Sequence, residues 1–362
     1  MIIVNMNSGL GNQMFQYALY CRLRKENPAQ KIYIDNSVYE AAGMEKKFEI
    51  ERIFDIKLPK LSDHLSSDSN EYYEKKEKEI LDALPHNWLS KGTFLASEYL
   101  IPILRKEFSG EWEIYTDLVS LYGKSRKYDM LMFLRRCPVI ADIFYKIKPP
   151  EKGFNMRIFY QKIHRAFNID NNRLNDSDYM EALLKVGEKN RIFIGNFESG
   201  DTYFLPVLEE IKTAFSFTEI SEDRNRAYAD KIEKSNSVSI HLRRGDHLLS
   251  NDKFFEEGGY YDRAVRKMKE AVLNPVFFLF SDDIAWCKQN LKVLGLTEND
   301  AVIFVEGNSG DLSFRDMQLM SLCKNNIIPI STFSWWASYL NENEKKVVIA
   351  PEGYWANASF YV

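Results

Sequence analysis

The chain has 362 residues, of which 45% are hydrophobic and 28% charged, and its formal net charge is −4. This length exceeds one ordinary core and predicts two domains, and the composition is that of a globular protein. The weak acidic charge argues against a nucleic-acid-binding protein, which needs a basic face for phosphates. Because the four cysteines are widely spaced, neither a zinc site nor a disulfide framework is predicted: Cys21, Cys137, Cys287 and Cys323.

The first 35 residues predict a strand, a glycine turn, a helix and a second strand. A β-branched run at 2–4 is followed by two glycines within 8–12, and apolar residues then repeat at helical spacing. KIYID at 31–35 reads as the second strand, so the segment resembles the opening of a Rossmann-like sheet. The start lacks a basic segment and a long apolar run, so we expect a cytoplasmic protein without a signal peptide.

Residues 60–185 are rich in charged and aromatic side chains, and we interpret them as a mostly helical insert. Within them, 122–167 holds eleven Lys and Arg against three acids, with aromatics interleaved. That pattern suits an anionic membrane surface, and the alternative is a solvated face over core aromatics. A peripheral contact at the inner face of the membrane, near a lipid-linked glycan acceptor, is one interpretation.

A strand running into a loop is predicted at 191–204 and a helix at 205–215, followed by a highly charged linker at 216–236. Strands then alternate with helices of about ten residues, which predicts a parallel, doubly wound sheet. The predicted fold class is α/β. Two Rossmann-like domains face each other across a cleft, at 1–220 and 235–345, with a C-terminal tail at 346–362. The predicted strands are 237–241, 275–280, 301–305, 326–330 and 347–350, and the helices are 260–272, 284–291, 314–324 and 335–340.

The sequence HLRRGD at 241–246 directly follows a predicted strand. Of its two arginines, one can enter the cleft while a carboxylate such as Asp246 holds the other. A guanidinium in the cleft suits a diphosphate, because its donor fork matches phosphate oxygens. The alternative is a surface Arg–Asp pair at the end of the strand.

Three further polar clusters each allow a functional and a structural interpretation. Residues 331–334, before a helix predicted to begin at Trp335, form either an anion site or an N-cap through Ser334. Asp282 and Asp283 end a strand and can either accept hydrogen bonds from guanine or cap the next helix. The glycines of 9–11 permit either close backbone approach to a ligand or a tight turn.

The sequence predicts no metal and no cofactor. Asp176 and Asp178 form the only D-x-D motif, and their place before a helical pattern favours capping. Since no metal motif is found, arginine and a helix dipole would meet the charge on a leaving group. An NAD-dependent oxidoreductase is disfavoured, because the first turn lacks the third glycine and a ribose-binding acid.

Four stretches resemble the bacterial α-1,2-fucosyltransferases of glycosyltransferase family 11. They are GLGNQMFQYAL at 9–19, HLRRGD at 241–246, FFLFSDDIAWCKQNL at 277–291 and DMQLMSLCKNNIIPISTFSWWASYLN at 316–341. The resemblance implies a GT-B-like fold, GDP-β-L-fucose as donor, inversion at the anomeric carbon, transfer to O2 of a galactoside, and no metal. Departures from the family pattern are NSGLGN at 7–12, GNFES at 195–199 in a predicted acceptor loop, and ISTFSWWAS at 330–338.

The resemblance also implies roles for individual residues. Arg243 would hold the β-phosphate, and His241 with Asp282 or Asp283 would contact guanosine. The donor diphosphate would face Gly11 and Asn12 in the first turn and a helix start formed by Thr332, Phe333 and Ser334. Asp246 is the first candidate for general base, followed by Asp252, Glu256 and Glu257. The alternatives are a fucosyltransferase of another linkage such as α-1,6, and a non-catalytic protein that binds GDP-sugars or carbohydrate.

Overall fold

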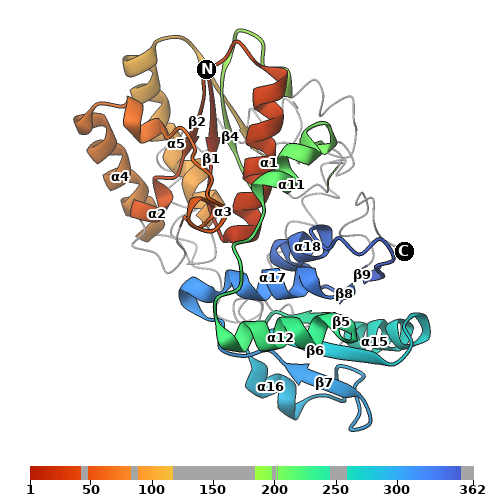
Figure 1. The fold of residues 1–362 in the computed structure, drawn as a ribbon. Coiled ribbons are helices and arrows are strands. Elements are labelled where there is room, and N and C mark those ends of the chain that lie inside the picture. The colour runs from red at the N-terminus through yellow and green to blue at the C-terminus, as the bar shows by residue number, and fades with distance from the viewer. Residues whose placement is uncertain are drawn as a thin grey trace, which may run out of the picture.

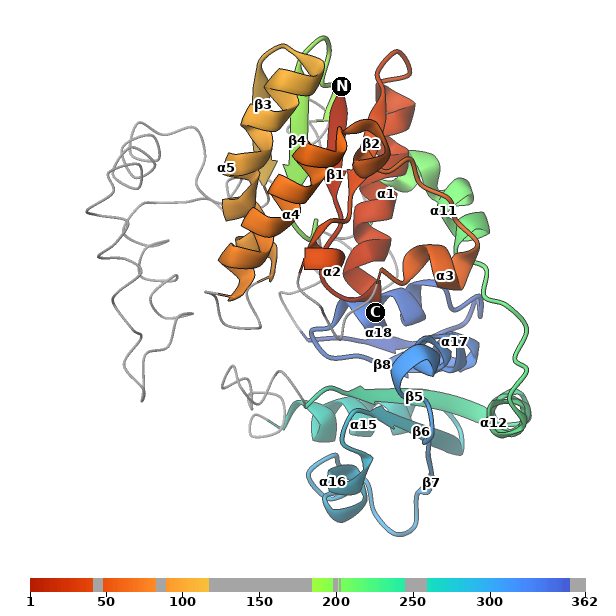
Figure 2. The same ribbon diagram turned by 90° about the vertical axis from the view of Figure 1, so that its left-hand side faces the viewer.

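The computed structural model consists of two α/β units joined end to end (Figure 1). It describes residues 1–41, 48–82, 89–116, 184–197, 201, 203–244 and 259–351. Each unit is built on a parallel sheet, and helices α17 and α18 of the second unit lie between the two sheets (Figures 1 and 2). The predicted α/β class with two Rossmann-like units is confirmed.

The first sheet has the strand order β2-β1-β4-β3 with every neighbouring pair parallel. Its strands are β1 (Ile2–Asn5), β2 (Ile32–Asp35), β3 (Trp112–Thr116) and β4 (Asn190–Ile194). The helices are α1 (Leu10–Glu26), α2 (Val38–Ala41), α3 (Ile50–Phe54), η1 (Leu61–His64), α4 (Ser67–Asp82) and α5 (Leu89–Phe108). The predicted opening of strand, turn, helix and strand is therefore confirmed.

Alternating apolar residues of β1 pack on opposite faces of this sheet, because successive side chains of a strand point to opposite sides. Ile2 and Val4 join the core that includes α1, whereas Ile3 packs with Leu100 and Leu104 of α5. Figure 2 shows α1 on one side of the sheet and α4 and α5 on the other. The predicted insert at 60–185 thus begins as a helical pair that covers one face. It also contributes β3, which the sequence did not predict, and residues 117–183 lie outside the described ranges.

The connection between the units contains η3 (Leu205–Val207), α11 (Leu208–Ala214) and α12 (Asp223–Glu233). The predicted linker at 216–236 therefore includes a helix. Asn225 and Ile232 are its buried residues: Ile232 joins the core shared by the two units, and the Asn225 amide donates to Asn308 at 2.9 Å. The charges that indicated a linker lie on the exposed side of α12, which is why composition alone suggested a loop.

The second sheet has the order β7-β6-β5-β8-β9, again with every neighbouring pair parallel. The strands are β5 (Asn236–Leu242), β6 (Pro275–Ser281), β7 (Ala301–Phe304), β8 (Asn325–Ile327) and β9 (Val348–Ile349). The helices are α15 (Tyr260–Ala271), α16 (Ile284–Gln289), η4 (Gly310–Leu312), α17 (Phe314–Leu322) and α18 (Thr332–Tyr339). Since β9 pairs with β8, the sheet extends into the stretch predicted as a tail from 346.

Aromatic side chains connect the two units through one continuous core. The ring of Phe15 on α1 lies 4.7 Å from that of Trp335 and 4.9 Å from that of Trp336, both on α18. Phe204 stacks on Trp336 with ring centroids 5.6 Å apart. An apolar contact of this kind fixes the relative position of two domains more firmly than a polar one. The N-terminal parts of α1 and α18 are therefore held together where the two units meet.

Within the described ranges, no helix combines the length and apolar character needed to cross a bilayer.

Candidate active site

The starts of α1 and α18 meet at the boundary between the two units. Gly11, in the first turn of α1, lies so close to α18 that a Cβ there would be 2.6 Å from the Phe333 nitrogen and from the Thr332 carbonyl carbon. The Thr332 hydroxyl donates to Asn12 Oδ1 at 2.6 Å, and the Trp336 indole N–H donates to the Gly11 carbonyl at 3.0 Å. Gly11, Asn12, Thr332 and Phe333, which the sequence singled out separately, thus form one cluster.

The helix start at α18 lies three residues earlier than predicted. Ser331, with extended backbone at φ −151°, is the N-cap, and α18 begins at Thr332 rather than at Trp335. Ser334 is fully buried inside the first turn, and its hydroxyl donates to the Ser331 carbonyl at 3.3 Å. The N–H groups at 332–334 are the ones that an α-helix leaves without intrahelical acceptors, so they can bind an anion.

The two helix starts concentrate positive electrostatic potential at this point. Each helix carries roughly half a positive elementary charge at its N-terminus. Because Gly11 touches the backbone of Thr332 and Phe333, the potentials of α1 and α18 act in the same small region. A phosphate group suits such a region in both charge and hydrogen-bonding capacity.

His241, at the end of β5, lies beside this cluster. Its ring is buried and lies 5.9 Å from the ring of Phe333, and its carbonyl accepts a hydrogen bond from the Tyr261 hydroxyl at 3.0 Å. The carboxyl end of β5 therefore borders the start of α18, as expected for neighbouring parallel strands whose following segments meet at one edge.

The two arginines after β5 differ in their surroundings. Arg244 is buried, and its guanidinium lies 3.8 Å from the ring centre of Trp286. Its Nε–H donates to Asp283 at 3.1 Å, so one carboxylate that holds it lies just after β6. Arg243 is only partly buried. Arg244 is thus the arginine fixed inside the protein, whereas part of Arg243 remains exposed to solvent.

Asp282 and Asp283 hold the loop after β5 in place. Asp282 accepts a hydrogen bond from the backbone N–H of Arg244 at 2.8 Å. One oxygen of Asp283 pairs with Arg244, and the other accepts the Trp286 N–H at 3.0 Å as the N-cap of α16. Both oxygens of Asp283 are therefore engaged within the protein, which corresponds to the capping alternative for that residue.

The turn before α1 departs from the family pattern at Ser8. The backbone conformation at this position is one that glycine adopts more easily than serine. Ser8 has φ +67°, in the left-handed region that favours glycine. Three hydrogen bonds hold this conformation: the Ser8 hydroxyl donates to Asn7, and the Ser8 carbonyl accepts from Gln13 at 3.1 Å and from Tyr39 at 2.8 Å.

Asp316, near the start of α17, was not singled out by the sequence analysis. Burial raises the pKa of its carboxyl to about 7, although a hydrogen bond from Asn308 at 2.8 Å favours the charged form. The segment η4, which directly precedes α17, borders the first unit, because Arg52 of α3 donates to the Asp311 carbonyl at 3.0 Å. Carboxyls with a pKa perturbed by burial are concentrated at functional sites. The raised pKa of Asp316 follows from the packing around α17, which the sequence pattern does not show.

Several predicted residues lie outside the described ranges. They are the candidate bases Asp246, Asp252, Glu256 and Glu257, the D-x-D pair Asp176 and Asp178, and the basic stretch 122–167. In the described part of the chain, no three His, Cys, Asp or Glu side chains are grouped so that they could hold a metal ion.

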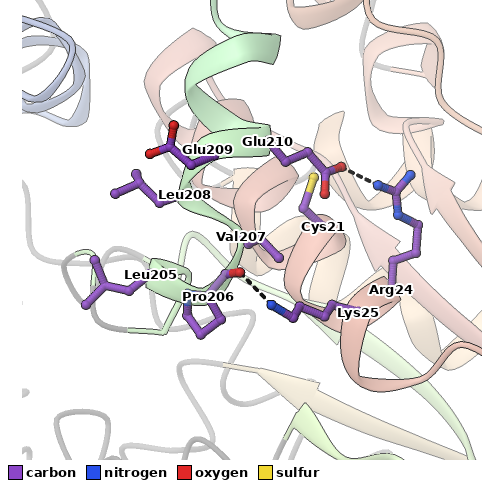
Figure 3. Close-up of a pocket in the computed structure, with 9 residues that line it drawn as sticks. All are labelled: Cys21, Arg24, Lys25, Leu205, Pro206, Val207, Leu208, Glu209 and Glu210. Atoms are coloured by element: carbon purple, nitrogen blue, oxygen red, sulfur yellow. Dashed lines mark hydrogen bonds and ion pairs between the residues drawn. The ribbon is translucent and has the colours of Figure 1, made fainter.

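A surface cavity of about 340 Å³ lies between α1 and the η3–α11 segment (Figure 3). Arg24 pairs there with Glu210, Lys25 donates to the Pro206 carbonyl at 2.7 Å, and burial raises the pKa of the Cys21 thiol to about 12. These residues are at the end of α1 opposite Gly11, a separation of roughly 20 Å along a helix that rises 1.5 Å per residue. The cavity is therefore distinct from the cluster at the two helix starts.

The family model for glycosyl transferase family 11 matches residues 149–361, more than half of the chain. This chain belongs to that family. An α-1,2-colitosyltransferase of Escherichia coli is 36% identical over 206 residues, which cover 54% of this chain and 69% of that protein. The O-antigen biosynthesis glycosyltransferase WbnK of Escherichia coli is 25% identical over 97% of this chain and 94% of its own length. The crystal structure of fucosyltransferase NodZ from Bradyrhizobium aligns with a TM-score of 0.42 at 15% identity, over 94% of this chain and 92% of that one.

Membership in family 11 confirms the resemblance that the sequence motifs indicated. The matched region contains His241, Arg243, Asp282 and the start of α18, whereas Gly11 and Asn12 precede it. The packing of α1 on α18 is what joins those two N-terminal residues to the matched region.

Proposed function

We propose that this family 11 glycosyltransferase moves L-fucose from GDP-β-L-fucose to O2 of a galactoside in a glycan acceptor. One arrangement supports the donor most strongly: the starts of α1 and α18 converge beside His241, with Arg243 on the adjoining loop. Two helix starts and an arginine suit a diphosphate, because backbone N–H groups and a guanidinium both donate to phosphate oxygens.

In the proposed reaction the acceptor hydroxyl attacks C1 of fucose from the face opposite GDP, so the configuration at C1 inverts. The bond from C1 to the β-phosphate oxygen breaks, and negative charge develops on that phosphate. Arg243 and the N–H groups at 332–334 would stabilise this charge, and losing such a contact costs on the order of 10²–10³ in rate. Asp246 remains the first candidate for the base that takes the hydroxyl proton.

For the nucleobase, we assign the guanine edge to His241 and to one of Asp282 and Asp283. Within the protein, Asp282 accepts the backbone N–H of Arg244, and Asp283 pairs with Arg244 and caps α16. A carboxylate that accepts from guanine leaves buried groups unpaired when uracil is bound, and such mismatches are costly. We therefore expect tighter binding of GDP than of UDP in calorimetry, and equal affinities would remove this assignment.

A related donor is the second candidate, because the 36% identical relative is a colitosyltransferase. Colitose is L-fucose without the 3-hydroxyl, so the two donors would differ in one hydrogen-bonding group. A site that hydrogen-bonds a hydroxyl rejects the analogue lacking it, whereas an apolar site discriminates weakly. The ratio of kcat/KM for the two GDP-sugars therefore separates the candidates.

The deciding experiment combines both donors with an array of acceptors that carry terminal galactose. We expect fucose transfer, with the product linkage and anomeric configuration read by NMR, and near-complete loss of transfer in Arg243→Lys. Preferential transfer of colitose would favour the second candidate, and a 1,6 linkage would replace the proposed one. If the chain binds GDP but forms no free GDP from the GDP-sugar with any acceptor present, a non-catalytic binding protein would be supported.

We further propose that transfer needs no metal, since arginine and helix starts can carry the leaving-group charge. Activity in EDTA should then match activity in buffer. Loss in EDTA with recovery on adding manganese would overturn this proposal and direct attention to Asp176 and Asp178.

A further inference from the structure

A buried polar network connects helix α4 to the turn that precedes α1. It begins at Glu77 of α4, whose Oε2 lies 2.7 Å from the Ser37 hydroxyl. The same hydroxyl lies 2.7 Å from Asp35 Oδ1, at the end of β2. Asp35 accepts from the Asn5 amide at 3.0 Å, and Asn5 accepts from the Asn7 amide at 2.9 Å. Five side chains thus lead from the insert to the donor-facing turn.

The protons in this network can be counted. A serine hydroxyl has one proton, and Ser37 contacts two carboxyl groups at the same distance. If its proton points to Asp35, the short contact with Glu77 is a hydrogen bond only when Glu77 itself carries a proton. The network therefore requires one neutral carboxyl group.

Asp35 is the member suited to be charged. Its two oxygens accept hydrogen bonds from the backbone N–H and hydroxyl of Ser37, the amide of Asn5 and the hydroxyl of Tyr73. Four donors satisfy the four lone-pair sites of a carboxylate. If Asp35 carried the proton, its O–H would face one of these four donors and would find no acceptor there.

Glu77 is the member suited to be neutral. Its side chain has no exposed surface, and its Oε1 has no hydrogen-bond partner. An ionised carboxylate with a bare buried oxygen is costly, whereas a neutral acid tolerates that position better. Burial and the nearby charge of Asp35 raise the pKa of Glu77 well above its usual range. The other titratable groups beside it are Tyr73 and Glu74 of α4, and the described α5 side chains packed with Tyr73 are apolar: Leu100, Ile103 and Leu104.

The far end of the network sets the entry into α1. Asn7 accepts from the Ser8 hydroxyl, and its backbone N–H donates to Gln16 at 3.1 Å. Ser8 has the left-handed backbone described above and directly precedes the N-cap Gly9. An unfavourable conformation at Ser8 persists only where surrounding contacts hold it. The position of Gly11 against α18 therefore depends on contacts that reach back to α4.

We propose that Glu77 is a protonated carboxylic acid whose O–H, through Ser37 and Asp35, positions the turn at residues 5–8 and with it the start of α1 against the donor. Glu77 is then a positioning residue rather than a catalytic one. The link to the donor rests on the proposed function, whereas the protonation and the order of the turn do not.

The matched variants are Glu77→Gln, which keeps a neutral donor of similar shape, and Ser37→Ala, which breaks the connection. Ser37→Thr restores a hydroxyl. The controls are Ser69→Ala and Glu107→Gln, because Ser69 donates to Glu107 at 2.6 Å in the same unit without touching the network.

Two measurements need no ligand. Infrared spectroscopy should show the carbonyl stretch of a buried carboxylic acid that disappears in Glu77→Gln and persists in Glu107→Gln. Amide hydrogen exchange at residues 5–12 should be up to about tenfold faster in Ser37→Ala, the factor expected for one lost hydrogen bond. It should be unchanged in Glu77→Gln, Ser37→Thr and Ser69→Ala. Absence of the band, or exchange in Glu77→Gln as fast as in Ser37→Ala, overturns the proposal.

GDP binding then tests the link to the donor. Calorimetry should give about tenfold weaker affinity for Ser37→Ala and wild-type affinity for Glu77→Gln and Ser37→Thr. Wild-type affinity in Ser37→Ala would overturn the positioning role. If the unaltered chain does not bind GDP, the proposed function fails, and the infrared and exchange results still decide the protonation and the order of the turn.

Discussion

Substitution of Gly11 by alanine tests whether the contact between α1 and α18 creates the site. The added Cβ would lie 2.6 Å from two backbone atoms of α18 and 2.7 Å from Thr332 Oγ1. Ordinary contacts of a Cβ are at least 3.4 Å. The overlap is therefore about 0.8 Å, and backbone atoms of a helix cannot rotate away as a flexible side chain does.

The magnitude follows from the displacement that relieves this overlap. A shift of about 0.8 Å would lengthen the Trp336–Gly11 hydrogen bond from 3.0 Å to roughly 3.8 Å, beyond hydrogen-bonding range. Overpacking costs about 1–3 kcal/mol and a lost hydrogen bond about 1 kcal/mol. We expect a loss of about 2–4 kcal/mol in the free energy of unfolding. A misplacement near 1 Å also costs about 10² in rate.

Gly9→Ala is the matched control, because a Cβ at Gly9 has no atom within 4 Å and its φ of −83° suits any residue. Its cost as a helix cap should be no more than about 1 kcal/mol. Urea unfolding measures the stability of both variants. Calorimetry measures their affinity for GDP, and initial rates measure their transfer activity. If Gly11→Ala matches Gly9→Ala in stability, GDP affinity and rate within threefold, the contact does not form the site.

Two further predictions concern the arginine pair and Asp316. Arg243→Lys should fold normally and lose on the order of 10²–10³ in transfer rate, because lysine lacks the donor fork. Arg244→Lys should mainly lower the melting temperature, since it gives up the contact with Trp286 and the bond to Asp283; the reverse ranking in rate would exchange their roles. For Asp316, the raised pKa means that the folded state binds more protons between about pH 4 and pH 7, so its unfavourable effect on stability grows as pH rises through that window. Asp316→Asn should therefore equal the unaltered chain in unfolding free energy near pH 4 and exceed it above pH 7, by at most about 4 kcal/mol. A constant difference across this range would contradict the assignment.

The sequence predicted most elements of the second unit, because β-branched runs and polar strand ends alternate clearly there. It placed the start of α18 three residues late, since Ser331 and Ser334 are equally suitable N-caps by residue type. The structure shows that Ser331 is the N-cap and that Ser334 lies inside the first turn. The strand β3 was missed because it closely follows a charged helical stretch.

The candidate site was predictable as a set of residues but not as an arrangement. The motifs identified Arg243 and Arg244 without indicating which one is buried. One partner of Arg244, Asp283, lies 39 positions further along the chain. Asp246, which the sequence suggested, lies outside the described ranges. Side-chain pairs at such separations depend on strand order, which periodicity does not reveal.

The hydrogen bond from Thr332 to Asn12 joins residues 320 positions apart. During synthesis at about 5–20 residues per second, Asn12 leaves the ribosome roughly 15–60 s before its partner exists. The first sheet also waits for β4, whose pairing with β1 spans more than half of the chain. A nascent or truncated polypeptide that ends before α18 therefore cannot assemble the paired helix starts. Anion binding at this point should appear only when translation is nearly finished.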